Sequence, residues 1–275
     1  MYNPLRTMEH YEPPIKLGFI ATNDDEGDIK WAQDNGLPYV EYNYHVDFDD
    51  TFPNRVQLGI WLRQHLVHPA AVGCWGQEFI SKDSAAKDAA VRRLRSTIDF
   101  AADIHCPIVM TGGGEREGDD LQSKLKDVVE VYKPMIDYAG EKNVKLCFYN
   151  CHWVNCVVGP EAWDVVLPAL PGMGIKFDPS HPYHVGQDPY QHLADYVEHV
   201  IHFHAKEVLK VGDTVVDEPM AGQGDFHWGR LMGILYKGGY TGVVSIEPHS
   251  KSWSGLARRP GILVAKKHLD QYLTT

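Results

Sequence analysis

Short apolar segments alternate with longer amphipathic segments along almost the whole chain. Eight of the short segments are strand-like, namely Lys16–Ala21, Tyr39–Tyr44, Ala70–Cys74, Pro107–Thr111, Lys145–Tyr149, Gly174–Asp178, Val200–Ala205 and Val243–Glu247. The segments between them have helical periodicity. The clearest stripe has apolar spacings of 4, 3, 4, 3 and 4, at Leu121, Leu125, Val128, Tyr132, Met135 and Ala139. The segment Ser84–Ala102 repeats this pattern, so the chain predicts strands and helices in alternation.

Strands that are separated by helices pair in parallel, either in a closed barrel or in an open doubly wound sheet. The open sheet usually carries a glycine fingerprint after its first strand, but Ile20–Asp25 contains no glycine. The glycine run in Thr111–Glu115 lacks the phosphate-binding spacings and indicates a tight turn. No linker or low-complexity segment interrupts the pattern. We therefore expect an α/β fold, a single (β/α)8 TIM barrel over residues 1–275.

Composition and charge narrow the class of protein. The 275 residues are 44% hydrophobic and carry a formal net charge of −11, which argues against nucleic acid as a partner. No apolar stretch approaches the roughly 18 residues that span a bilayer, and the first residues lack the apolar core of a signal peptide. Five cysteines without a C-x-x-C pair indicate reduced thiols. We expect a cytoplasmic protein with no membrane partner.

Polar residues end three consecutive strands on the face that points into the barrel. By the period of two, Asp178 ends the sixth strand, His204 lies on the seventh and Glu247 ends the eighth. Active sites of such barrels lie at these strand ends. Two carboxylates and an imidazole that meet there need a compensating cation, although separate ion pairs are the alternative. A divalent metal is the economical explanation, with Mn²⁺ or Mg²⁺ favoured and Co²⁺, Fe²⁺ or Zn²⁺ as alternatives.

A family resemblance rests on four stretches: Phe177-Asp178-Pro179-Ser180-His181, His202-Phe203-His204-Ala205-Lys206-Glu207, Gly222-Gln223-Gly224-Asp225-Phe226-His227-Trp228 and Ser245-Ile246-Glu247-Pro248. The chain resembles the sugar phosphate isomerase/epimerase family of xylose-isomerase-like barrels over nearly its whole length. Members bind a divalent metal through Glu, Asp, His and Glu at the ends of strands five to eight. The resemblance places the last three ligands at Asp178, His204 and Glu247, and it implies that His181 and Lys206 contact substrate oxygens and that Trp75 lines the pocket.

The sequence departs from this family on strand five, where Lys145–Trp153 contains no Glu. Cys147 is expected at the equivalent position. In epimerases of the family, the glutamates of strands five and eight act on opposite faces of the substrate carbon, so this departure affects the mechanism. His152, just beyond the strand, is a candidate fourth metal ligand or base, with a plain loop histidine as the alternative.

The resulting hypothesis is a metal-dependent enzyme that acts on a keto-sugar or related polyol carbonyl, of sugar isomerase or epimerase type. The metal, for which Mn²⁺ is the first choice, would chelate the carbonyl and hydroxyl oxygens of a small sugar. Glu247, His152 or His181 would remove the neighbouring proton as the catalytic base. A homo-oligomer is compatible with the exposed helices of a barrel.

Two alternative functions stay open, and a third is set aside. Loss of the strand-five Glu makes a β-eliminating lyase on 3-keto-glycosides a competitor, similar to C-glycoside deglycosidases, which work with a small accessory subunit. A non-catalytic sugar-binding barrel follows if the loss abolishes metal affinity. A DNA-repair endonuclease of the same superfamily would need a basic surface, which the charge of −11 opposes.

Three weaker features complete the analysis. Glu41 and His45 share the polar face of the second strand, so either could reach the pocket, although a Glu41–Lys pair fits equally well. Lys251 follows the last strand, where barrels often bind anions. The insertion Val208–Pro219 contains Gly212-Asp213 between β-prone runs and predicts a hairpin that caps the site or meets a partner.

Overall fold

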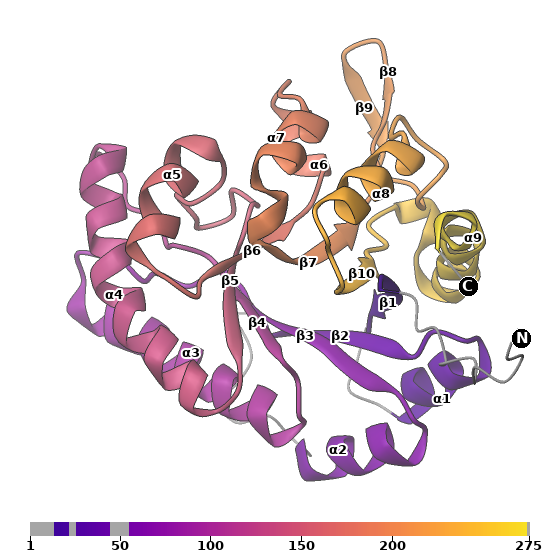
Figure 1. The fold of residues 1–275 in the computed structure, drawn as a ribbon, viewed down its shortest axis with the longest axis horizontal. Helices are drawn as coiled ribbons and strands as arrows, with labels where there is room; N and C mark the ends of the chain where they lie inside the picture. Colours follow the sequence, from indigo (N-terminus) through magenta and orange to yellow (C-terminus); the bar gives the residue numbers. More distant parts are fainter. Residues whose placement is uncertain (1–13, 22–25, 45–54, 274–275) are drawn as a thin grey trace, which may run out of the picture.

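The computed structural model describes residues 14–21, 26–44 and 55–273 of the chain. Eight parallel strands close into a barrel in the order β1-β10-β7-β6-β5-β4-β3-β2 (Figure 1). Their bounds are β1 Lys16–Ile20, β2 Tyr39–Tyr44, β3 His68–Cys74, β4 Ile108–Thr111, β5 Lys145–Tyr149, β6 Gly174–Phe177, β7 Val200–Ala205 and β10 Val243–Ile246. The predicted (β/α)8 TIM barrel is confirmed, and each predicted strand matches an observed one within two residues.

Helices surround the barrel in Figure 1. They are α1 Glu26–Asp34, α2 Arg55–Gln64, α3 Ser84–Asp103, α4 Leu121–Glu141, α5 Pro160–Ala169, α6 Ser180–His184, α7 Pro189–Tyr196, α8 Trp228–Lys237 and α9 Arg258–Leu269. The two longest begin at aspartate caps. Asp83 accepts a hydrogen bond from the Ala85 amide at 2.9 Å and Asp120 accepts one from the Ser123 amide at 3.0 Å, which satisfies free amides of the first turn. Within the described ranges, no helix is long and apolar enough to cross a membrane.

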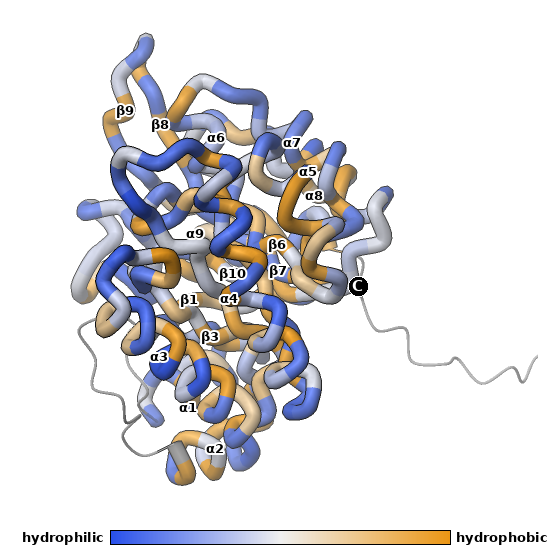
Figure 2. Tube along the Cα trace, turned by 90° about the vertical axis from the view of Figure 1, so that its left-hand side faces the viewer, coloured by the Kyte–Doolittle hydropathy of each residue, from blue (hydrophilic) through white to orange (hydrophobic). Residues whose placement is uncertain are grey.

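The apolar residues form two clusters of different size. The larger one fills the layer between strands and helices, so the helices carry hydrophobic and hydrophilic residues on different sides (Figure 2). The smaller one lies inside the barrel and contains Ala71, Trp75, Met110, Cys147 and Tyr149. Side chains from β3, β4 and β5 therefore fill their side of the barrel interior below the mouth.

One strand departs from simple alternation. The pairing of β6 with β7 runs from Ile175↔Val200 to Lys176↔His202, so Ile201 has no partner at this irregularity. Alternation predicts that Ile201 points towards the helices, but it packs against the interior cluster instead. The irregularity keeps His202 and His204 on the inner face, where both are fully buried.

The predicted hairpin is present. Strands β8 (Leu209–Val211) and β9 (Thr214–Asp217) pair antiparallel around Gly212, whose φ is +62°, and they project beyond the helices in Figure 1. The stem of the hairpin is attached to the barrel, because Ser250 Oγ donates to Asp217 Oδ2 at 2.8 Å. The glycine run after β4 packs closely against the β5 side: the amide of Gly113 donates to Asn155 Oδ1 at 2.6 Å.

Candidate active site

Two carboxylates and one imidazole meet at the C-terminal mouth of the barrel. Asp178 follows β6, His204 lies on β7 and Glu247 follows β10, and these strands are neighbours in the sheet. One potential ligand atom from each residue lies within 4.8 Å of the other two. His204 Nδ1 is 2.7 Å from Glu247 Oε2. The structure thus brings together the three residues that the strand-end pattern singled out.

Asp178 is held by its neighbours in one orientation. Its Oδ1 accepts hydrogen bonds from the amide of Ser180 at 2.9 Å and from the Ser180 hydroxyl at 2.7 Å. Its Oδ2 lies 3.4 Å from Lys176 Nζ and 3.3 Å from His181 Nε2. Burial raises the pKa of the Asp178 carboxyl, but the charges of Lys176 and His181 outweigh burial and hold the pKa well below its usual range. Asp178 is therefore an ionised carboxylate with Oδ2 directed at the cluster.

Glu41 on β2 reaches the same cluster from the other side of the barrel. Its side chain is fully buried, with Oε2 2.9 Å from His204 Nε2 and 2.7 Å from His202 Nε2. Burial raises the pKa of Glu41, but His204 and His202 lower it to about 2. The pKa of His204 is raised, because Glu41 and Glu247 outweigh the effect of burial. Of the two alternatives for Glu41, a reach into the pocket or a pair with lysine, the contacts with His202 and His204 match the first. His45 lies outside the described residues.

The donor set fits a divalent metal. Two carboxylates and an imidazole nitrogen within 4.8 Å match the ligands of such ions. Glu41 accepts from His204 Nε2, which leaves Nδ1 for the cluster, and a carboxylate behind a ligating histidine is the usual outer-shell arrangement. Two cationic neighbours oppose the ion. The ammonium group of Lys176 and Nε2 of His181 lie 3.4 and 3.3 Å from Asp178 Oδ2, where they compete with a metal for this oxygen.

The residue of β5 that lies nearest the mouth is not the predicted one, Cys147. In the register of β5 with β6, Cys147 pairs with Gly174 and Tyr149 pairs with Lys176, so Cys147 lies deeper in the barrel. Burial raises the pKa of the Cys147 thiol, which is a neutral part of the interior cluster. The inward residue of β5 nearest the mouth is Tyr149. The prediction that Cys147 takes the position of the missing strand-five Glu was wrong, because counting along the strand does not fix the register of β5 with β6.

Trp75 and Lys176 line the interior just below the cluster. The Trp75 ring stacks on the Tyr149 ring with centroids 4.3 Å apart, and Trp75 Nε1 donates to Asn43 Oδ1 at 2.8 Å. Lys176 Nζ lies 5.5 Å from the centroid of the Trp75 ring. The side chain of Lys176 is only 1% exposed, so an aromatic ring and one carboxylate replace its hydration.

His152 stands apart from the three-residue cluster. It is exposed and lines a cavity of about 450 Å³ beside the mouth, together with Asn150 and His181. Burial and the charge of His181 lower the pKa of His152. Among the described residues, His152 is not in the groups whose ligand atoms converge.

His181 joins this cavity to the cluster. Besides its contact with Asp178, it lies next to the Cys151 thiol. Burial lowers the pKa of His181, but Asp178 and Cys151 outweigh burial and raise it to about 9. His181 is therefore an imidazolium near neutral pH.

A second group of charges forms the rim of the mouth. Lys206 Nζ lies 3.2 Å from Glu218 Oε1, and His184 Nε2 lies 2.9 Å from the same oxygen. His249 connects the rim to the cluster, with Nε2 2.8 Å from Glu247 Oε1 and Nδ1 3.4 Å from Glu218 Oε2. Burial lowers the pKa of Lys206, but the carboxylates of Glu247, Asp178 and Glu218 raise it overall. Sequence reasoning missed Glu218 and His249, because both lie on loops without a periodic signal.

The carboxylate of Glu207 holds the loop that contains the Gly222–Trp228 stretch. Its buried carboxylate accepts hydrogen bonds from the amides of Gly222 and Phe226 at 3.0 and 3.1 Å, and from Trp228 Nε1 at 2.7 Å. A Cβ atom at Gly224 would lie 2.3 Å from the carbonyl oxygen of Val208. The glycines of this loop thus allow it to pack directly against Glu207.

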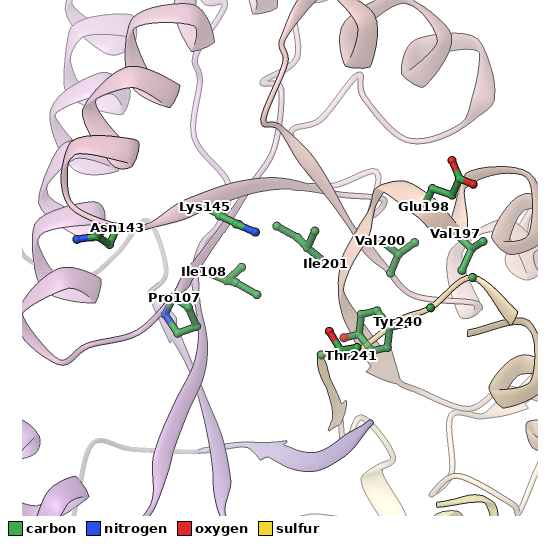
Figure 3. Close-up of a pocket in the computed structure, with 13 residues that line it drawn as sticks. Pro107, Ile108, Asn143, Lys145, Val197, Glu198, Val200, Ile201, Tyr240 and Thr241 are labelled. Carbon is green, nitrogen blue, oxygen red and sulfur yellow. The ribbon is translucent and has the colours of Figure 1, made fainter. Parts of the chain in front are cut away.

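Another cavity, of about 300 Å³, lies at the opposite end of the barrel. Figure 3 shows its lining from the starts of β4, β5 and β7 and from the segment before β10, with Ile108, Lys145, Val200 and Tyr240 among the labelled residues. Residues at this end of a barrel contribute to stability rather than to catalysis. The cluster at the other end is therefore the candidate active site.

The protein is an eight-stranded parallel barrel with a carboxylate and imidazole cluster at its C-terminal mouth. The family model of the xylose isomerase-like TIM barrel matches residues 29–272, and the chain belongs to this family. A comparison with curated proteins finds no match.

Several solved structures share the fold at low sequence identity. The IolI protein with a bound zinc atom is 18% identical, covers 94% of this chain and 100% of its own, and has a TM-score of 0.78. A xylose isomerase domain protein from Planctomyces limnophilus is 17% identical over 95% of this chain and 98% of its own, with a TM-score of 0.71. An L-ribulose 3-epimerase is 13% identical, covers 94% of this chain and 95% of its own, and has a TM-score of 0.74. These similarities show the fold.

Proposed function

We propose that this protein is a divalent-metal-dependent enzyme that removes a proton next to the carbonyl of a keto-sugar, of sugar isomerase or epimerase type. The observation that carries the proposal is the convergence of Asp178, His204 and Glu247 within 4.8 Å at the barrel mouth. Family membership supports it, as do neighbours described as an L-ribulose 3-epimerase, a D-psicose 3-epimerase and a zinc-binding IolI protein.

Asp178, His204 and Glu247 would hold the metal, for which Mn²⁺ is our first choice. When bound, the ion polarises the carbonyl and stabilises negative charge on the oxygens of the sugar. Glu41 keeps the His204 ring in one orientation through its 2.9 Å contact with Nε2. Lys206, whose side chain is 7% exposed and whose Nζ lies 3.2 Å from Glu218 Oε1, would donate a hydrogen bond to a sugar oxygen.

Glu247 is the candidate base. Its pKa is lowered well below the usual range, because His204, His249 and Lys176 outweigh the effect of burial. It is therefore ionised and able to accept a proton from a carbon atom held above the cluster. His249 Nε2, 2.8 Å from Glu247 Oε1, offers a hydrogen-bonded route from this carboxylate to the partly exposed rim.

Solvent-hydrogen exchange tests the proposal. Metal-loaded protein is incubated in D2O with D-fructose, D-tagatose or L-ribulose, and the recovered sugars are analysed by NMR. Incorporation of deuterium at a carbon next to the carbonyl, lost in Glu247→Gln, is the expected result. No incorporation with any of these ketoses, at a confirmed metal load, would contradict the proposal and leave a non-catalytic sugar-binding barrel as the better description.

A β-eliminating lyase is a second candidate, and the cavity beside His181 favours it. The cavity of about 450 Å³ is connected to the cluster through His181, which contacts Asp178, and it has apolar walls from Val158, Pro160, Pro182 and Val185. This space suits an apolar group attached to the sugar. Release of the phenol from a 3-keto aryl glycoside, rather than exchange without loss of a substituent, would identify the lyase.

A further inference from the structure

Three nitrogen donors from three separate elements surround the carboxylate of Glu218. Lys206 follows β7, His184 ends α6 and His249 follows β10. Their nitrogen atoms lie 3.2, 2.9 and 3.4 Å from the nearest Glu218 oxygen, in that order. These three residues are the rim donors. Two of them face Oε1 and His249 faces Oε2, so both oxygens of one planar carboxylate are bound.

Glu218 itself comes from the projecting hairpin and not from the barrel. Its backbone is fixed at the end of β9, because the preceding residue, Asp217, accepts a hydrogen bond from Ser250 at 2.8 Å. The side chain of Glu218 is 24% exposed, whereas that of Lys206 is 7% exposed. The Glu218 side chain can therefore rotate into solvent while the hairpin stays in place. The buried Lys206 ammonium would then lose this partner, which favours another anion in the same position.

The rim donors lie directly beside the metal cluster. His249 contacts both carboxylates, with Nε2 2.8 Å from Glu247 Oε1 and Nδ1 3.4 Å from Glu218 Oε2. One imidazole ring therefore separates the position of the Glu218 carboxylate from the candidate base. A sugar whose carbonyl lies at the cluster can reach that position with the other end of its carbon chain.

We propose that the rim donors form a carboxylate-binding subsite and that the substrate is a keto-sugar acid. The carboxylate of the substrate replaces that of Glu218, which rotates into solvent, and the carbonyl at the other end of the chain lies at the metal cluster. This inference rests on the proposed function and narrows its substrate class. In the free protein, Glu218 occupies the subsite and keeps the buried Lys206 ammonium paired. A planar carboxylate matches the two-oxygen pattern of Glu218 better than a tetrahedral phosphate does.

Two matched pairs of sugars test this assignment. D-Fructuronate and D-tagaturonate differ from D-fructose and D-tagatose only in a carboxylate at the end of the chain remote from the carbonyl. The preference is the ratio of kcat/KM for the acid to kcat/KM for the neutral sugar, measured as deuterium exchange by Mn²⁺-loaded protein. We expect a preference of at least about tenfold in wild type for one of these pairs, because the charge-assisted contacts form only with the acid. The 6-phosphate of the same ketose should have a lower kcat/KM than the acid.

Three variants separate the subsite from general electrostatics. Glu218→Ala empties the subsite and should raise the preference at least about tenfold above wild type, because the acid no longer competes with the carboxylate of the protein. Lys206→Met should reduce the preference to about one, since it removes the least exposed of the rim donors. Asp213→Ala is the matched control. It removes an exposed carboxylate from the turn of the same hairpin and should leave the preference at the wild-type value.

A second readout needs neither metal nor turnover. Chelator-treated wild type and Glu218→Ala are titrated in a calorimeter with D-gluconate and with D-glucitol, a polyol that lacks the carboxylate. We expect Glu218→Ala to bind D-gluconate at least about tenfold more tightly than wild type does. The two proteins should bind D-glucitol equally.

Equal kcat/KM for the acids and the neutral sugars, in both wild type and Glu218→Ala, would overturn the subsite. A D-gluconate affinity that Glu218→Ala does not raise would overturn it as well. A higher kcat/KM for the 6-phosphates than for the acids would contradict the assignment to a carboxylate. By contrast, wild type that exchanges neither the acids nor the neutral sugars, at a confirmed metal load, would refute the proposed function, while the D-gluconate titration still decides the subsite.

Discussion

Glu41 and His204 meet inside the barrel with Oε2 2.9 Å from Nε2, although two strands separate β2 from β7 around the sheet. Both side chains are fully buried. The contact fixes which nitrogen of His204 faces the cluster, so a residue from the far side of the barrel sets the geometry of the candidate metal centre.

The first prediction concerns this contact. Glu41→Gln should weaken Mn²⁺ binding by about 10- to 100-fold, because the amide no longer stabilises the Nε2–H form of His204. Calorimetric titration of chelator-treated protein measures the affinity. Glu161→Gln, an exposed substitution on α5, is the control and should leave it unchanged. Equal affinities of wild type and Glu41→Gln would show that Glu41 only fills the interior.

The second prediction concerns the buried ammonium. Lys176 Nζ lies 3.4 Å from Asp178 Oδ2, so Lys176→Met should raise the affinity for Mn²⁺ by at least about tenfold. Methionine keeps the apolar length of the side chain and its contact with Trp75. Lys145→Met, an exposed change at the opposite end of the barrel, should have no effect. Weaker binding in Lys176→Met would mean that the ammonium supports the site.

The third prediction concerns pH and the rim. Burial raises the pKa of Glu218, but His249, Lys206 and His184 outweigh it and lower the pKa from 4.5 to about 2. Because the folded pKa is lower than the unfolded one, the stabilisation is complete above about pH 4.5 and is lost as the pH falls towards 2. Because solvent screens the charges of this partly exposed rim, Glu218→Gln should reduce the free energy of unfolding by about 1–2 kcal/mol at pH 7 and by progressively less below pH 4.5.

Urea unfolding of wild type and Glu218→Gln at pH 7, 5, 4 and 3 gives this difference. A difference that stays constant across the series would assign the effect to packing and not to the charge of Glu218.

The fourth prediction concerns the loop anchor. Glu207→Ala leaves the amides of Gly222 and Phe226 and the indole of Trp228 without their buried acceptor. It should lower the free energy of unfolding by about 3 kcal/mol or more. Glu198→Ala, at the other end of the barrel, serves as control. Thermal unfolding followed by circular dichroism measures both, and equal midpoints would contradict the anchoring role.

Most of the fold could be predicted because its signals are local. Apolar runs fixed all eight strands within two residues, and the consecutive strand ends located Asp178, His204 and Glu247. The partners of Glu41 could not be predicted, because they depend on how the barrel closes. Tyr149 was missed for a related reason, since the register between β5 and β6 decides which residue reaches the mouth.

The rim was the least predictable part. Glu218 follows the hairpin and His249 follows β10, so their meeting at 3.4 Å depends on loop paths that have no periodicity. His152 shows the opposite case. Its place next to strand five suggested a ligand, but its imidazole is exposed beside the cavity.

The most direct test of the central claim is the stoichiometry of metal binding in wild type and Asp178→Asn. Protein dialysed against a chelator is titrated with Mn²⁺ in a calorimeter, and circular dichroism confirms that both forms are folded. We predict about one Mn²⁺ per wild-type chain and at least about 100-fold weaker binding in Asp178→Asn. No binding by the wild type, or equal binding by the two proteins, would contradict a metal centre at Asp178, His204 and Glu247.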